Sequence, residues 1–140
     1  MNISRLRTNP GTRVLIANED PLEAMALESL LRIERNCETR ITTDMREVLA
    51  MHECWPFDML FLDMQNETLD GLKVVDQLGH AIRKAELTLV ALVHRGSEQV
   101  RLASLASGAV ATLAKPIDHN QATAQINRAF SLMPVRANSF

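Results

Sequence analysis

The sequence has few cysteines, few aromatic residues and no strong excess of charge. Its two cysteines, Cys37 and Cys54, are too few for a disulfide framework and lack the spacing typical of zinc sites. We therefore expect two reduced, buried thiols. Aromatic residues make up 4% of the chain and tyrosine is absent, which argues against a base-stacking platform for nucleic acid. A formal net charge of −2 argues against binding of polyanions by bulk charge.

Long apolar runs are also missing. No segment approaches the ~18 consecutive apolar residues typical of a membrane span, and residues 1–13 lack the apolar stretch of a secretory signal. We therefore expect a cytoplasmic protein that binds neither membrane nor nucleic acid. Apolar residues nevertheless make up 46% of the 140 positions, which is enough for the core of one domain. We expect that domain at residues 13–133, between a flexible segment at 1–12 and a flexible tail at 134–140.

Short apolar segments alternate with helical patterns along the chain. Aliphatic and β-branched runs predict strands at residues 13–17, 38–42, 58–62, 87–93 and 110–113. Apolar residues at helical spacing predict helices at residues 21–35, 43–53, 70–84, 97–107 and 118–132. Apolar strands separated by helices are typical of a parallel sheet covered on both faces. We therefore predict an α/β fold with a doubly wound, five-stranded parallel sheet.

Acidic residues and a lysine follow the predicted strands, at the edge where such folds bind ligands. Asn18, Glu19 and Asp20 come after the first strand. Asp63 ends the third strand, and Lys115 follows the fifth. Carboxylates suit Mg²⁺, and a carboxylate beside a divalent cation and a lysine can accept a phosphoryl group. The charges alone favour a plain salt bridge between Asp63 and Lys115, since such pairs are common at loop edges.

The spacing of three motifs resembles the receiver domain of two-component response regulators. VLIANEDP at residues 14–21 resembles the family's first strand and acidic pair. FDMLFLDMQNETLDGLKVV at residues 57–75 resembles the third strand and the loop after the phosphoacceptor. ASGAVATLAKPI at residues 106–117 resembles the Gly-Ala turn, the fifth strand and the Lys-Pro pair. The resemblance covers roughly residues 12–132 and implies a flavodoxin-like (βα)5 receiver fold with strand order 2-1-3-4-5.

The resemblance also implies roles for single residues around the acceptor. It makes Asp63 the phosphoacceptor and Lys115 the residue that contacts the phosphoryl group or the acceptor carboxylate. The family's Lys-Pro bond is typically cis, which here concerns Pro116. The family's turn before the next helix falls on Asp70 and Gly71.

The implied metal site is a Mg²⁺ site built on the acidic pair. Its ligands would be Glu19, Asp63 and the backbone carbonyl of Gln65. Asn18 stands where the family usually has an acid, and an amide oxygen coordinates hard cations without supplying a negative charge. We therefore expect Mg²⁺ to bind, more weakly than at a site with both acids.

The residues that relay a switch in the family are also changed. Val93 occupies the position usually held by Thr or Ser, so the hydroxyl that contacts the phosphoryl group is missing. His94 stands where a small residue is usual, and it could shield the site from water. Glu67 replaces a loop proline, and Thr112 replaces an aromatic residue that often couples to the switch. The usual coupling between hydroxyl and aromatic side chain is therefore expected to be absent.

The resemblance implies a stand-alone receiver of a phosphorelay. It would take a phosphoryl group from a histidine kinase or a phosphotransfer protein and signal to an unidentified downstream protein. It would have no enzymatic activity beyond self-phosphorylation and slow autodephosphorylation. The fourth predicted helix carries more apolar residues than one buried stripe needs, which are Val100, Leu102, Ala103, Leu105 and Ala106. A partner or homodimer face over the fourth helix, fifth strand and fifth helix is therefore one interpretation, beside ordinary core and surface.

Two other functions remain open. A pseudo-receiver would bind partners independently of phosphorylation; Asn18, Val93 and Glu67 favour it, whereas Asp63 and Lys115 favour a working receiver. An unrelated small α/β enzyme or nucleotide-binding protein is the third possibility. The chain has neither a Gly-rich phosphate loop nor a GxSxG motif, which argues against this third class.

Overall fold

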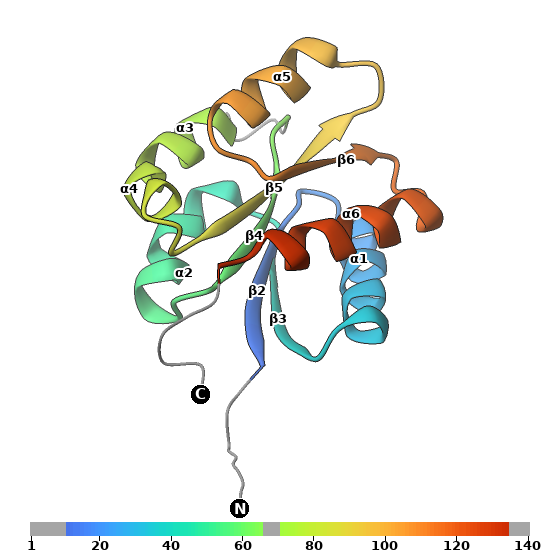
Figure 1. The fold of residues 1–140 in the computed structure, drawn as a ribbon, viewed down its shortest axis with the longest axis horizontal. Helices are drawn as coiled ribbons and strands as arrows, with labels where there is room; N and C mark the ends of the chain where they lie inside the picture. Colours follow the sequence, from blue (N-terminus) through green and yellow to red (C-terminus); the bar gives the residue numbers. More distant parts are fainter. Residues whose placement is uncertain (1–10, 66–70, 135–140) are drawn as a thin grey trace, which may run out of the picture.

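The computed structural model describes residues 11–65 and 71–134, in which strands and helices alternate. The strands are β2 (Thr12–Ala17), β3 (Cys37–Thr42), β4 (Met59–Asp63), β5 (Thr88–His94) and β6 (Ala111–Lys115). The helices are α1 (Pro21–Glu34), α2 (Val48–Cys54), α3 (Gly71–Gln77), α4 (Gly79–Arg83), α5 (Glu98–Ala106) and α6 (His119–Leu132), with a 3-10 turn η1 (Met45–Glu47) before α2. This order confirms the predicted alternation (Figure 1).

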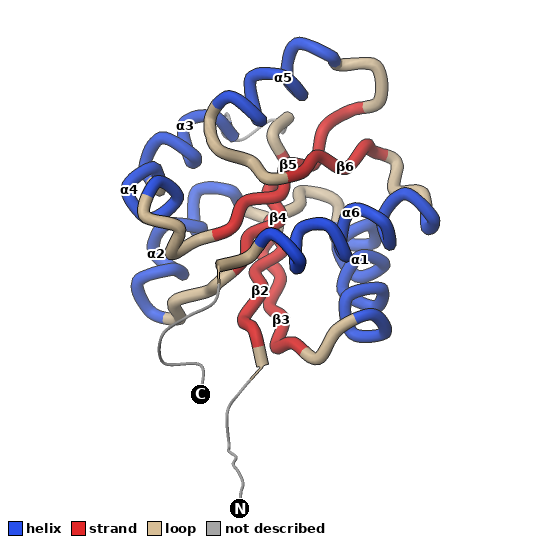
Figure 2. The backbone as a smooth tube through the Cα atoms, viewed as in Figure 1, coloured by secondary structure: helices blue, strands red, loops and turns tan. Residues whose placement is uncertain are grey.

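The five strands form one parallel sheet in the order β3-β2-β4-β5-β6. When the strands are counted from one along the chain, this order is 2-1-3-4-5, as the resemblance implies. Figure 2 shows the strands running through the centre of the molecule. Asp63 pairs in register with Leu92 of β5, and His94 of β5 pairs with Lys115 of β6. The carboxyl ends of the three strands β4, β5 and β6 therefore meet at one edge of the sheet.

Helices cover both faces of the sheet, and each face buries its own apolar cluster. Figure 1 shows α1 and α6 together on one side and α2, α3 and α4 on the other. Alternate strand residues supply the two clusters, so Leu89 of β5 packs on the α2 and α3 side and Leu92 on the α1 and α6 side. Strands buried on both faces are apolar almost throughout, which is why they could be recognised in the sequence.

The helices differ from the prediction in two places. The helix predicted at residues 70–84 is divided into α3 and α4, with a break at Leu78 before Gly79, a residue of low helix propensity. The helix predicted at residues 43–53 begins as a 3-10 turn. Of the two thiols, Cys37 is half-buried and Cys54 is exposed. The expected burial of Cys54 is therefore wrong, because Cys54 ends α2, in which only Val48 is buried.

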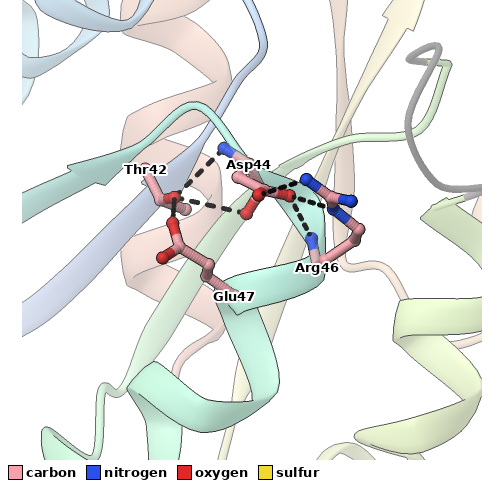
Figure 3. A network of polar contacts seen from close by, with 4 residues as sticks. All are labelled: Thr42, Asp44, Arg46 and Glu47. Carbon is pink, nitrogen blue, oxygen red and sulfur yellow. Dashed lines mark hydrogen bonds and ion pairs between the residues drawn. The ribbon is translucent and has the colours of Figure 1, made fainter.

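A small polar network fixes the end of β3 beside the first strand (Figure 3). The carboxylate of Asp44 accepts a hydrogen bond from the backbone N–H of Arg46 and two from its guanidinium, each at 2.9 Å. The hydroxyl oxygen of Thr42 accepts the backbone N–H of Asp44 at 3.1 Å and lies 3.2 Å from Glu47 Oε1. The carbonyl of Thr42 in turn accepts the backbone N–H of Asn18 at 3.0 Å. The network thereby anchors the loop that follows β2.

The limits of the domain remain a prediction. Residues 1–10 and 135–140, on which the expected flexible ends fall, lie outside the part of the chain that the structure describes. Within that part, none of the helices has the length and apolar character needed to span a membrane.

Candidate functional site

A pocket opens at the carboxyl edge of the sheet, where the sequence predicts the site. The residues that line it come from the loops after β2, β4, β5 and β6 and from the first turn of α1. They are Asn18, Glu19, Asp20, Glu23, Asp63, Gln65, His94, Lys115 and Pro116. The structure therefore brings together eight of the residues that the sequence analysis places at this site, and it adds Glu23.

The centre of the pocket is an ion pair between Asp63 and Lys115. Lys115 Nζ donates to Asp63 Oδ1 across 2.5 Å, although the two residues lie on strands separated by β5. The side chain of Asp63 is 2% exposed and that of Lys115 is 10% exposed. Removing two charges from water costs free energy that a hydrophobic pair would not cost. The burial of this pair is therefore weak evidence that it stabilises the fold.

Gln65 connects the Asp63 carboxylate with the loop after β5. Its backbone N–H donates to Asp63 Oδ1 at 3.2 Å. Its side-chain Oε1 accepts the backbone N–H of His94 at 2.8 Å, and its Nε2 donates to Ser97 Oγ at 3.3 Å. One residue thus contacts Asp63 on one side and the residue preceding α5 on the other.

The acidic side of the pocket is held by the loop that joins β2 to α1. The carboxylate of Asp20 caps α1 by accepting the backbone N–H groups of Leu22 at 3.0 Å and Glu23 at 3.3 Å. Asn18 is 1% exposed; its Oδ1 accepts the backbone N–H of Asp20, and its Nδ2 donates to Glu23 Oε1, both at 3.0 Å. Position 18 therefore carries an amide in place of the family's usual acid, and the carboxylate of Glu23 lies beside that amide.

The donor atoms of the pocket are compatible with Mg²⁺. Carboxylate and carbonyl oxygens are the ligands of this hard cation, which usually takes one or two carboxylates and keeps several waters. Glu19, Asp63 and Gln65, which carry such oxygens, line one pocket. No group of three or more His, Cys, Asp or Glu side chains within residues 11–65 and 71–134 is arranged to hold a metal on its own. A cation here would therefore complete its coordination with water.

Of the described positions that relay a switch in the family, His94 lines the pocket and Val93 and Thr112 do not. Val93 is 3% exposed and packs in the apolar cluster on the α2 and α3 side, so it does not line the pocket. His94 follows it on the other face of β5, is exposed and lines the pocket. Thr112 of β6 is half-buried and pairs in register with Ala91, away from the pocket.

Gly71 packs against the end of β4, and the Lys-Pro pair lines the pocket. Gly71 begins α3 so close to the end of β4 that a Cβ atom would lie 2.6 Å from the Cα of Met64, which explains the absence of a side chain. The Lys115–Pro116 peptide bond is cis, as the resemblance implies. Asp70 and Glu67 fall outside the described residues.

Two contributors were missed in the sequence. Glu23 lies in the first turn of α1, where acids are common because they favour the positive end of the helix dipole. Its contact with Asn18 therefore leaves no distinct signal in the sequence. The sequence places Ser97 at the start of a predicted helix, and its contact with Gln65 depends on how two loops meet.

Comparison with known proteins identifies the fold family. Residues 14–127 match the sequence profile of the response regulator receiver domain. The chain belongs to this family. A receiver domain is the phosphorylation module of two-component signalling, generally binds Mg²⁺ and exchanges phosphoryl groups with a histidine kinase or phosphotransfer partner.

Solved receivers share the fold at low sequence identity. The chemotaxis response regulator CheY4 of Vibrio cholerae is 19% identical with a TM-score of 0.73, covering 85% of this chain and 98% of that one. A response regulator receiver domain protein from Clostridium thermocellum is 20% identical with a TM-score of 0.71, covering 86% of this chain and 94% of that one. These likenesses concern the fold of the receiver.

Part of a longer protein is similar in sequence to this chain. The protein-glutamate methylesterase/protein-glutamine glutaminase 3 of Rhodospirillum rubrum is 30% identical over 105 residues, which are 75% of this chain. The chain spans 28% of the length of that relative. The activity in that relative's name is therefore not carried over to this receiver.

Proposed function

We propose that this receiver accepts a phosphoryl group on Asp63 and signals through contacts with other proteins. The observation that carries the proposal is the buried ion pair between Asp63 and Lys115 inside a pocket lined by oxygen donors. The donor would be a histidine kinase or a phosphotransfer protein. The receiver would act as a stand-alone regulator on a downstream protein.

The proposed reaction needs little from the protein beyond position and charge. An oxygen of the Asp63 carboxylate attacks the phosphorus of a phosphorylated histidine. The new O–P bond forms as the P–N bond breaks, and the imidazole leaves with the bonding electron pair and takes up a proton. The ammonium of Lys115, 2.5 Å from Asp63 Oδ1, is placed to pair with the negative charge on the transferred group.

The cation would be held by Glu19, Asp63 and the backbone carbonyl of Gln65. When bound, it supplies positive charge that offsets the charge of the phosphoryl group. Asn18 already uses its amide oxygen for the backbone N–H of Asp20, so its contribution to the cation would be weak.

The test is the intact mass of the protein after incubation with Mg²⁺ and acetyl phosphate. We expect a phosphoryl adduct on the wild type and none on Asp63→Asn, which keeps the size of the side chain but lacks the nucleophile. Asp58→Asn is a matched control, since Asp58 lies at the opposite end of β4 and accepts the backbone N–H of Arg13 at 2.9 Å. An adduct of equal yield on Asp63→Asn would show that another residue is labelled.

The pseudo-receiver is the alternative, and the burial of Val93 among apolar residues favours it. In that case the wild type carries no adduct, even with a histidine kinase as donor, and Asp63→Asn leaves the affinity for a partner unchanged. Val93→Thr separates the two functions further, because a restored hydroxyl strengthens a phosphate-dependent response only at a working site.

The candidate partner or homodimer face remains part of the proposal. On α5, Leu102 is 52% exposed and Leu105 is 36% exposed, and Ala106 beside them is also exposed. Apolar side chains in this position are available to a downstream protein or to a second copy of the chain.

A further inference from the structure

The side chain of Gln65 connects the acceptor with the first turn of α5. Its backbone N–H contacts Asp63, while its side-chain amide bonds the backbone N–H of His94 and the hydroxyl of Ser97. Both ends of the amide are therefore used within the β5–α5 loop. Val93, at the position where other receivers carry a hydroxyl, is buried and cannot hydrogen-bond through its side chain.

Ser97 occupies the N-cap position of α5 without capping it. A serine at this position normally accepts a backbone N–H from the second or third residue of the helix, here Gln99 or Val100. The Ser97 side chain makes no such bond. Its hydroxyl oxygen instead accepts Gln65 Nε2 at 3.3 Å. Ser97 therefore has two alternative hydrogen-bond partners, one in the β4–α3 loop and one in its own helix.

We propose that Gln65 is a positioning residue that exchanges Ser97 between these two partners. The inference rests on the proposed function, because the exchange is driven by the phosphoryl group on Asp63. Before phosphorylation, Gln65 Nε2 holds the Ser97 hydroxyl away from α5. After phosphorylation, Nε2 donates to a phosphoryl oxygen, and Ser97 is released to cap the helix.

The exchange follows from the relative strength of the two acceptors. Hydrogen bonds to an ionised oxygen are roughly twice as strong as those between neutral groups. A phosphoryl group on Asp63 would add such oxygens in the pocket that Gln65 itself lines. A neutral serine hydroxyl at 3.3 Å is the weaker competitor for Nε2. An element with two discrete arrangements biased by one site is what transmission of a signal requires.

The test follows the backbone amides of Gln99 and Val100 by hydrogen exchange, resolved by NMR, with and without acetyl phosphate and Mg²⁺. Intact mass is measured on the same samples. A capping bond of ordinary strength, ~1 kcal/mol, corresponds to about a fivefold rise in protection of the capped amide. We expect that rise in the phosphorylated wild type.

Three variants separate the exchange from a general effect on stability. In Gln65→Met, a side chain of similar length cannot hold Ser97, so we expect about fivefold higher protection already without acetyl phosphate and no further rise with the adduct. In Ser97→Ala, protection stays low in both states although the adduct forms. Gln121→Met, on the exposed first turn of α6, is the matched control and should behave as the wild type.

Each outcome decides a different part of the inference. A wild type that carries the adduct without a change at Gln99 and Val100 overturns the exchange, and so does a Gln65→Met variant that responds like the wild type. A wild type without an adduct, from acetyl phosphate and from a histidine kinase alike, overturns the proposed function and the phosphate-driven step. The comparison of unphosphorylated Gln65→Met with the wild type still decides in that case whether Gln65 holds Ser97 away from the helix.

Discussion

The orientation of the Asn18 amide is set by two neighbours, of which one donates a hydrogen bond and the other accepts one. The backbone N–H of Asp20 can only donate, so it requires Asn18 Oδ1, and Nδ2 must therefore face the carboxylate of Glu23. An aspartate at position 18 would keep the first bond. It would also place a second negative charge where Nδ2 now lies, 3.0 Å from Glu23 Oε1.

We predict that restoring the acid at position 18 strengthens Mg²⁺ binding and that the charge of Glu23 adds to the effect. Asn18→Asp should bind Mg²⁺ about fivefold more tightly than the wild type, because the cation relieves repulsion of ~1 kcal/mol between the two carboxylates. Asn18→Asp with Glu23→Gln should bind Mg²⁺ more weakly than Asn18→Asp alone, since one of the two negative charges is removed. Calorimetric titration with MgCl₂ measures both, and Glu23→Gln alone is the control. Equal affinities for the single and double variants would contradict the pairing.

His52 gives the fold a dependence on pH. Burial lowers the pKa of its imidazole below the usual value of 6.5, against smaller opposing effects of Asp58 and Glu86. Its Nδ1 accepts the backbone N–H of Phe57 at 3.3 Å, and the two rings lie 4.3 Å apart. Since folding depresses the pKa, the neutral ring contributes stability that is fully present above the unfolded-state pKa. That contribution is lost as the pH falls through the lower folded-state pKa.

We therefore predict that the free energy of unfolding falls between about pH 7.5 and about pH 5.5, and that part of this fall is due to His52. His52→Asn keeps an acceptor near Phe57 but does not titrate, so its stability should fall less over the same range. Urea denaturation at the two pH values measures the difference, with His80→Asn on an exposed position of α4 as control. An equal fall in wild type and His52→Asn would assign the dependence to other groups.

At the scale of elements, two glycines at helix ends have opposite roles. Gly108 follows α5 with a φ of +116°, and a Cβ atom there would lie 2.7 Å from Ile82 Cγ2. Gly79 begins α4, and a Cβ atom there would meet only the end of the Arg83 side chain, at 2.8 Å. A left-handed position against a packed side chain requires glycine, whereas a helical position beside a flexible side chain does not.

The two alanine substitutions should therefore change stability in opposite directions. We predict that Gly108→Ala lowers the free energy of unfolding by about 1–3 kcal/mol. Gly79→Ala should raise it by about 0.5–1 kcal/mol, because the Arg83 side chain can move and the unfolded chain loses freedom. Urea unfolding of the pair measures both. Destabilisation by Gly79→Ala would mean that the break between α3 and α4 depends on the glycine.

The elements could be predicted because apolar runs and caps are local signals. The helix predicted at residues 21–35 and the strand predicted at residues 58–62 both agree with the structure to within one residue at each end. The ion pair of Asp63 and Lys115 could be placed because the two residues lie at the ends of predicted parallel strands, and such ends share one sheet edge. The contacts of Asn18 with Glu23 and of Gln65 with Ser97 could not be predicted, since they depend on side-chain orientation and on how loops meet.

At the scale of the whole molecule, two apolar clusters share a single sheet. Leu89 and Leu92 of β5 are both fully buried, and they belong to different clusters. Truncation of either leucine should destabilise the whole domain as one cooperative unit, because neither layer of helices can remain packed once the sheet unfolds.

We predict that Leu89→Ala and Leu92→Ala each lower the free energy of unfolding by about 2–5 kcal/mol and that both variants still unfold in one transition. Fluorescence of Trp55, in the Leu89 cluster, and far-ultraviolet circular dichroism should then give coincident curves. Leu102→Ala on the exposed face of α5 is the control and should change little. Curves that separate for one variant alone would show that the two layers unfold independently.

The ion pair joins the third strand of the chain to the fifth, and this spacing has a consequence during protein synthesis. Asp63 leaves the ribosome long before Lys115, which lies 52 residues further along the chain. A nascent chain that ends before β6 presents the carboxylate without its ammonium partner and without the last strand of the sheet. Asp63, the proposed acceptor, would therefore be able to accept a phosphoryl group only after translation has passed residue 115. Incomplete chains would not be phosphorylated by a phosphodonor.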